Sequence, residues 1–178
     1  MSRGWFIAGT DTGAGKTRVS CLLLQALAAA GQIAVGMKPV ASGCHSTESG
    51  WRSADALELI TASRSSIDYA DVNPYALVSA CAPHLAAREM GVEIRTEHIL
   101  NSFERLKKKF PWVVVEGVGG WRVPLGEVLT MADVARALRL PVILVVGLRL
   151  GCLNHALLTV EAIQRDGLDL VGWVANVM

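Results

Sequence analysis

The sequence predicts an α/β fold, in which a parallel β-sheet is flanked by helices on both faces. The first observation is that apolar runs of strand length alternate with segments of helical period along the chain. The second is length, because 178 residues can bury one core but are too few for two ordinary domains. The chain has no repeat, low-complexity tract or linker, so we expect a single domain spanning residues 1–178.

The predicted elements follow one another as strand, helix and strand. The chain opens with the apolar run WFIA, continues as a helix over residues 17–30 and returns as the run IAVGMKPV. The pattern loosens over residues 42–73, where one helix is expected over 53–61. The alternation then resumes with WVVVEG, MADVARALRL, PVILVVG, NHALLTVEAIQRDG and LVGWVAN. Gly31 and Gly167 are typical of helix C-terminal stops.

Composition argues against several classes of partner. Charged residues make up 19% and the net charge is +1, which gives no electrostatic basis for binding nucleic acid or an anionic membrane. The lysines at residues 107–109 are expected to form a solvated helix end. The apolar runs are shorter than the ~20 residues of a membrane span, and the N-terminus lacks a secretory core. The four cysteines show no pairing or metal-ligand spacing, which favours a reducing, cytoplasmic location.

The stretch GTDTGAGKT, at residues 9–17, carries the first functional signal. It follows an apolar strand and opens a helix, and Gly13 and Gly15 allow backbone amides to curl around an anion at the helix N-terminus. Lys16 would reach the outer phosphates of a nucleotide, and the Thr17 hydroxyl would bind Mg²⁺. The spacing departs from the usual phosphate loop, because five residues rather than four separate the outer glycines. The alternative is a glycine-rich turn without a ligand.

Further candidates follow the other predicted strands, where ligands bind in open parallel sheets. Lys38 and Ser42 follow the second strand. A lysine at a strand end is usually a surface charge. Beside a phosphate loop, however, it is a candidate to neutralise the charge on a phosphoryl acceptor. Glu116 ends a valine-rich strand, where phosphate-loop enzymes use an acid to hold the metal directly or through water. Asp55 could complete a metal shell with Thr17 and Glu116, although an isolated helix aspartate is more often a surface cap.

The strand exit LRLGCLNHALL becomes a helix N-terminus near residues 151–154. Exposed amides there would favour a carboxylate ligand. An ordinary helix capped by Asn154 explains the same residues equally well. The sequence has no serine in a G-x-S-x-G setting, and its spacing indicates no cysteine–histidine pair, so we expect no covalent protein nucleophile.

Six motifs together resemble those of the dethiobiotin synthetase family. They are GTDTGAGKT, GMKPVASG, DYADVNPYAL with APHLAA, VVVEGVGGWRVPLG, LPVILVVGLRLGCLNHALLT and GLDLVGWVAN. They occur in the order and at the spacing of that family, over residues 5–176. Related ATPases share the phosphate loop and the glutamate motif but not KPVASG or GCLNH. The longer phosphate loop is this family's version of it.

The resemblance implies a single P-loop-type domain that acts as an ATP-dependent cyclo-ligase in biotin biosynthesis. Such an enzyme uses ATP and Mg²⁺ to close the ureido ring of dethiobiotin from 7,8-diaminononanoate and CO₂. A substrate amine becomes a carbamate, the carbamate oxygen takes the γ-phosphoryl group, and the neighbouring amine displaces phosphate. This last attack is intramolecular and needs no protein nucleophile. The resemblance also implies a homodimer with the active site near its interface.

By matching position, the resemblance assigns roles to residues along the chain. The residues expected to act in catalysis are Thr12, Lys16 and Lys38. Those expected to contact the nucleotide are Asp11, Gly13, Ala14, Gly15, Lys16, Thr17, Arg18, Glu116, Gly117, Gly119 and Asn176. Those expected to hold the diamine are Thr12, Lys38, Ser42, Gly119, Gly151, Cys152, Leu153 and Asn154, the last four across the dimer interface. The expected Mg²⁺ ligands are Thr17, Asp55 and Glu116.

Two departures from the family's pattern affect these expectations. Gly13 replaces a larger or acidic residue of many relatives, which removes any side-chain contact there. The family continues beyond residue 178 with a further strand, a helix and part of the nucleotide-base pocket. If the native chain ends at residue 178, we expect weaker base recognition and looser selectivity for ATP. Two alternatives remain: a partitioning or regulatory ATPase of the same superfamily that works as a nucleotide switch, and a relative that binds phosphate without turnover.

Overall fold

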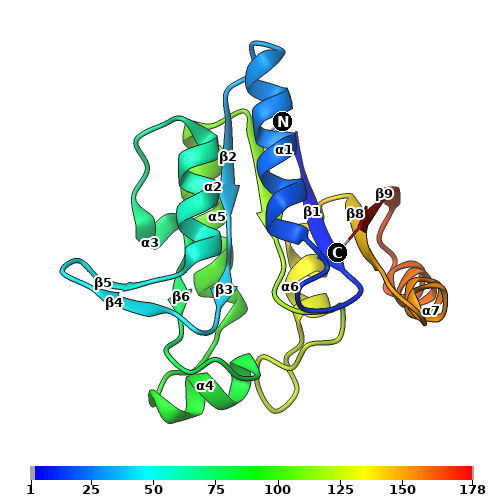
Figure 1. Ribbon diagram of the computed structural model, residues 1–178. Helices are drawn as coiled ribbons and strands as arrows, with labels where there is room; N and C mark the ends of the chain where they lie inside the picture. Colours follow the sequence, from blue (N-terminus) through cyan, green and yellow to red (C-terminus); the bar gives the residue numbers. More distant parts are fainter. Residues whose placement is uncertain (1–2, 178) are drawn as a thin grey trace.

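A computed structural model describes residues 3–177 and confirms the predicted α/β class (Figure 1). The central sheet has five strands, all parallel, in the order β2-β7-β1-β8-β9. They are β1 (Arg3–Gly9), β2 (Ala34–Met37), β7 (Trp112–Glu116), β8 (Val142–Leu148) and β9 (Leu170–Val177). Because the strands are parallel, their carboxyl ends meet at one edge of the sheet, and the residues that follow them become neighbours.

Helices cover both faces of this sheet (Figure 1). The long helices are α1 (Lys16–Ala29), α2 (Ala54–Ser63), α5 (Thr96–Lys109), α6 (Met131–Leu138) and α7 (Cys152–Arg165). Successive residues of a strand point to opposite faces. Val114 therefore packs with residues of α1 and α2, whereas Val113 and Val115 pack with residues of α5, α6 and α7. This double burial explains why β7 is an uninterrupted run of valines.

The helix ends follow the predicted signals. Gly31 and Gly167 have φ angles of 71° and 75° just beyond α1 and α7, a conformation that glycine adopts without steric cost. Ser53 caps α2, accepting the Ala56 N–H at 3.4 Å, and the helix extends to Ser63, slightly beyond the expected end. The lysines at residues 107–109 form the last turn of α5, which confirms the expected helix end. Their positive charges interact favourably with the negative end of the helix dipole.

The sequence pattern had predicted one continuous strand over the run IAVGMKPV, but this prediction is wrong. β2 ends at Met37, and the chain resumes as β3 (Val40–Ala41), which pairs with β6 (Tyr75–Ala76) in a separate small sheet. The Lys38 N–H donates to the Val72 carbonyl at 2.8 Å, and Pro39 has no N–H to continue a ladder. The strand therefore breaks at Lys38, which leaves this side chain at the carboxyl edge of the main sheet.

Several elements were not predicted from the sequence. They are β4 (His45–Thr47), β5 (Gly50–Arg52), α3 (Tyr69–Val72), β6, α4 (Pro83–Glu89) and most of α5. The first four and α4 are too short to establish a helical or strand period. α5 does carry a helical period, because Ile99, Phe103 and Leu106 are buried on one face. β4 and β5 form an antiparallel hairpin. Within residues 3–177, no helix has both the length and the apolar character that crossing a membrane requires.

Candidate active site

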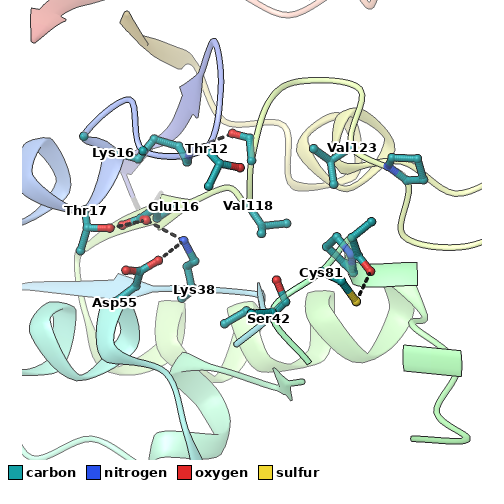
Figure 2. Close-up of a pocket in the computed structure, with 18 residues that line it drawn as sticks. Thr12, Lys16, Thr17, Lys38, Ser42, Asp55, Cys81, Glu116, Val118 and Val123 are labelled. Atoms are coloured by element: carbon teal, nitrogen blue, oxygen red, sulfur yellow. Dashed lines mark hydrogen bonds and ion pairs between the residues drawn. The ribbon is translucent and has the colours of Figure 1, made fainter. Parts of the chain in front are cut away.

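A cavity of about 670 Å³ lies at the carboxyl edge of the main sheet, beside the phosphate loop (Figure 2). Its walls come from the phosphate loop, the ends of β2 and β7, the start of α2, and the segment before α4. Ten of the predicted site residues line it: Thr12, Gly13, Gly15, Lys16, Thr17, Lys38, Ser42, Asp55, Glu116 and Gly119. The fold therefore gathers at one place residues that lie far apart in the sequence.

The phosphate loop connects β1 to α1 and requires its glycines. Gly13 and Gly15 have φ angles of 75° and 95°, which other L-residues rarely adopt. A side chain at Gly15 would collide with Asn176 Nδ2, at 2.2 Å from the added Cβ atom. The Asn176 side chain itself donates to the Ala14 carbonyl at 3.1 Å, so β9 supports the loop from outside. Asn176 thus lies against the predicted nucleotide loop.

Lys16 is the first residue of α1 and is only 6% exposed. Its ammonium group donates to the carbonyls of Asp11, at 2.9 Å, and Gly119, at 2.7 Å. Burial, and secondarily the positive charge of Lys38, lower the pKa of Lys16 to about 8. The lysine is therefore held inside the loop by neutral acceptors, where an anion would be a stronger partner.

Lys38 forms the centre of a buried charge cluster. Its ammonium lies 2.7 Å from both Glu116 Oε1 and Asp55 Oδ2 (Figure 2). The Lys38 and Glu116 side chains are 3% and 0% exposed, and the Thr17 hydroxyl donates to Glu116 Oε1 at 2.8 Å. Burial opposes the charge on Lys38, but the two carboxylates outweigh it and raise the pKa of this lysine. Burial likewise opposes ionisation of Asp55, but Lys38 outweighs it and lowers the pKa of that carboxyl.

The backbone holds this cluster in place. The Lys38 carbonyl accepts a hydrogen bond from the buried Asn73 Nδ2 at 2.7 Å, and its N–H is bonded as described above. Glu116 Oε2 is buried and has no hydrogen-bond partner. A buried carboxylate oxygen without a partner is costly unless a cation or donor satisfies it. Within the described part of the chain, no group of three His, Cys, Asp or Glu side chains has metal-binding geometry, so any metal here would also need hydroxyl or ligand oxygens.

The other end of the cavity is less polar. Ser42 and Thr12 reach it from opposite walls, and Val118, Val123 and the segment around Cys81 line the same end (Figure 2). Sequence reasoning missed the wall formed by Ala80, Cys81, Ala82, Pro83, Val118, Val123 and Pro124. Small and apolar residues in irregular segments carry no chemical signal of their own, and for the segment near Pro83 only the APHLAA part of the family-like motifs could have indicated them.

Several predicted residues lie outside the cavity lining. Arg18 is exposed on α1, and Asp11 accepts an ion pair from Arg149 of the β8–α7 loop. Gly117 is buried behind the cavity, where an added Cβ would meet Phe6. Asp11 Oδ1 also accepts the Thr12 N–H at 2.7 Å. Asp11 therefore supports the phosphate loop and links it to the β8–α7 loop in this structure.

The residues of the α7 N-terminus are also outside the cavity of their own chain. They are Gly151, Cys152, Leu153 and Asn154. Gly151 is the N-cap, with a φ angle of 93°, and no side chain caps the helix. The reading of Asn154 as the cap is therefore wrong, because Asn154 is an exposed residue inside the first turn. Asp55, by contrast, is not merely a surface residue near a helix end, because it pairs with Lys38.

The parallel sheet, the phosphate loop and the buried lysine at its end are the features of phosphate-loop ATPases. Among solved structures, the kinase domain of Escherichia coli tyrosine kinase ETK aligns with a TM-score of 0.58 at 15% identity, covering 99% of this chain and 68% of that one. The septum site-determining protein MinD from Pyrococcus horikoshii, complexed with Mg-ADP, aligns with a TM-score of 0.55 at 16% identity, covering 99% and 70%. At these identities the likeness concerns the fold alone.

The sequence comparisons narrow the class to a family. Residues 3–178 match the family described as an AAA domain. The ATP-dependent dethiobiotin synthetase BioD of Xanthomonas euvesicatoria is 56% identical over 172 residues, which cover 97% of this chain and 77% of that protein. The protein of the same name from Xylella fastidiosa is 54% identical, covering 97% and 76%. The chain belongs to the dethiobiotin synthetase family, as the sequence motifs had predicted.

Proposed function

We propose that this chain catalyses the ATP-dependent closure of the dethiobiotin ureido ring from 7,8-diaminononanoate and CO₂. The observation that carries the proposal is a cavity that joins the two buried lysines to a phosphate loop, in a chain 56% identical to an enzyme named for this reaction. Phosphoryl transfer between two anions requires positive charge more than it requires a protein nucleophile. Lys16 and Lys38 supply that charge from two sides of the cavity.

Lys16 and the phosphate-loop amides are assigned to the triphosphate of ATP. The lysine currently bonds to the neutral carbonyls of Asp11 and Gly119. A phosphate oxygen is a better acceptor than a carbonyl, because the hydrogen bond is then charge-assisted. A phosphate oxygen of ATP would therefore replace these carbonyls as the acceptor for the Lys16 ammonium group, and the existing cavity gives it access.

Mg²⁺ fits the donor set formed by Thr17, Asp55 and Glu116. Hydroxyl and carboxylate oxygens are the ligands that this ion prefers. The buried Oε2 atom of Glu116 has no partner, and a cation beside it would satisfy that charge. When bound, the ion would neutralise charge on the β- and γ-phosphates. Its presence is part of the proposal.

The diamine is assigned to the less polar end of the cavity. Thr12 and Ser42 offer hydroxyl groups to the substrate nitrogens, and Val118 and Val123 offer apolar walls to its alkyl chain. Lys38 supplies positive charge where the carbamate oxygen would attack the γ-phosphoryl group. Holding the second amine on the adjacent carbon makes the final ring closure intramolecular, which accounts for the absence of an assigned protein nucleophile.

The proposal includes a homodimer in which the α7 N-terminus serves the cavity of a second copy. Gly151–Asn154 lie outside the cavity of their own chain, yet their exposed amides suit a carboxylate such as the one that ends the diamine substrate. Beside them, Leu150, Leu153 and Leu157 are 104%, 78% and 65% exposed. Leucines gathered at one helix end are typical of a protein–protein contact.

A cytoplasmic location is also proposed, supported by four free cysteines, which are typical of a reducing compartment. The partitioning ATPase is less supported than the ligase, because proteins of that class match here at low identity and only in fold.

Mass spectrometry tests the proposed reaction. The purified chain is incubated with diaminononanoate, bicarbonate, ATP and Mg²⁺, and the expected product is the cyclic urea together with ADP and phosphate. Omitting ATP is the control. ATP hydrolysis that is indifferent to the diamine, without any cyclic urea, would contradict the ligase and favour the nucleotide switch.

A further inference from the structure

The loop that follows β7 forms one wall of the active-site cavity. Val118, Gly119, Val123 and Pro124 line the cavity, and the Gly119 carbonyl accepts the hydrogen bond from Lys16 Nζ at 2.7 Å. The position of this loop therefore affects the phosphate-binding lysine and also the space assigned to the diamine.

Trp121 anchors the middle of this loop. It is 4% exposed, and its ring meets Phe6 of β1 edge to face, with ring centroids 6.0 Å apart. Its indole Nε1–H donates to Asp166 Oδ2 at 2.7 Å. The neighbouring Arg122 guanidinium donates to Asp166 Oδ1 at 2.9 Å. Each oxygen of one carboxylate thus holds one residue of the loop.

Asp166 is well placed to act as this anchor point. It is the C-cap of α7, where its backbone N–H donates to the Ala162 carbonyl at 3.0 Å, and its side chain is only 9% exposed. Hydrogen bonds to a carboxylate are stronger than neutral ones, and low exposure reduces their screening. The aspartate does not line the cavity, and no sequence motif had singled it out.

We propose that Asp166 is a positioning residue for the reaction, because it holds Trp121 and Arg122 and thereby fixes the loop that carries the Gly119 carbonyl and the valine walls of the cavity. The kinetic consequence rests on the proposed function, whereas the anchoring itself does not. A displacement of about 1 Å at a reacting centre lowers rates by up to about 10²-fold, so the anchor matters without touching substrate.

Four variants separate the parts of this anchor. Asp166→Ala removes both acceptors, and Asp166→Asn keeps an oxygen for the indole but no charge for Arg122. Trp121→Phe keeps an aromatic ring on Phe6 but removes the N–H donor. Asp169→Ala is the matched control, because this aspartate is exposed just beyond the same helix end.

Two readouts are measured for each variant, with the melting temperature as a check on global folding. The first is the rate at which trypsin cleaves after Arg122, followed by mass spectrometry. We expect Asp166→Ala and Trp121→Phe to raise it by about tenfold, since the loop opens more often once a charge-assisted bond is lost. The second is ligation kinetics, in which kcat/KM for the diamine is expected to fall by about tenfold, with a smaller change in the KM for ATP.

Asp166→Asn is expected to lie nearer the parent chain than Asp166→Ala in both readouts, and Asp169→Ala is expected to match the parent chain. Parent-like cleavage and kinetics in both Asp166→Ala and Trp121→Phe would overturn the proposal. If the parent chain itself forms no cyclic urea, the proposed function fails, and the trypsin rates alone then decide whether Asp166 anchors the loop.

Discussion

At Lys38 a buried ammonium group lies 2.7 Å from each of two carboxylates, and the same residue faces the proposed reaction. Such a cluster stabilises the fold only while each buried charge keeps an oppositely charged partner, because an unpaired buried charge is costly. Glu116 is the critical partner, since it is fully buried and one of its oxygens already lacks a hydrogen bond. At the scale of single residues, stability and chemistry therefore depend on the same atoms.

Replacing Lys38 by Met is expected to lower the free energy of unfolding by about 3 to 5 kcal/mol at neutral pH, because Glu116 loses its counter-charge inside the protein. Urea denaturation measures the change. Adding Glu116→Gln to the same chain removes the unpaired charge and is expected to recover more than half of the loss. Lys108→Met, at an exposed lysine, is the control. Additive losses in the double variant would contradict the coupling.

Lys16→Ala is expected to reduce kcat by about 10² to 10³, the typical effect of removing one preorganised electrostatic group from a transition state. Steady-state ligation kinetics at saturating ATP and diamine provide the measurement. Lys108→Ala should leave the rate unchanged. A Lys16→Ala enzyme with the parent kcat would remove this lysine from the mechanism.

At the scale of elements, α6 shows how a helix start is fixed next to the active-site loop. Thr130 and Asp133 form a capping box, in which the Thr130 N–H and hydroxyl donate to Asp133 Oδ2 at 2.8 and 2.6 Å. Burial opposes ionisation of Asp133, but these hydrogen bonds outweigh it and lower the pKa of the carboxyl. This capping box fixes the point at which α6 begins. It therefore also fixes the end of the loop after β7, which carries the cavity-lining Val118 and Val123.

Asp133→Ala is expected to lower the free energy of unfolding by about 1 kcal/mol at pH 7. A carboxyl with a lowered folded-state pKa stabilises the fold above its usual pKa, and this contribution is lost as the pH falls through the folded value. The difference between the variant and the parent should therefore shrink below about pH 4. Chemical denaturation at several pH values measures it, with Asp169→Ala as the control. A difference that stays constant down to pH 2 would contradict the assignment.

At the scale of the whole molecule, the chain leaves one side strongly apolar. Besides the leucines of the α7 start, Trp173 and Val177 of β9 are 68% and 82% exposed. Figure 1 shows α7 and β9 together at one side of the molecule, away from α2 and the β4–β5 hairpin. Exposed apolar surface of this kind favours association, and the proposed dimer would bury the α7 part of it.

If the proposed dimer forms, Leu153→Glu is expected to convert it to a monomer at micromolar concentration, because a charge would be buried in an apolar contact. Sedimentation velocity measures the mass, and the melting temperature tests whether the monomer remains folded. Ile33→Glu, at a residue that is 60% exposed elsewhere on the surface, is the control. A parent chain that sediments as a monomer would contradict the proposed assembly.

Local sequence patterns were enough to predict the α/β class, the phosphate loop, the helix stops at Gly31 and Gly167, and the family. These features depend on local patterns, since periodicity, glycine conformation and short motifs act within a few residues of each other. The sequence also indicated Lys38 as a site residue beside the phosphate loop, and Asp55 and Glu116 as possible members of one metal shell. Short elements such as β4 and α3 carried no such pattern.

How these elements and side chains contact one another follows from the three-dimensional fold. In the structure the second strand ends before Lys38, and this lysine pairs with Asp55 and Glu116. The N-cap of α7 is Gly151 rather than Asn154. The fold also brings Asp166 to the loop after β7, a contact between residues 44 and 45 positions apart. The physical reason is that ion pairs and anchors across a parallel sheet depend on strand order, which no local stretch of sequence encodes.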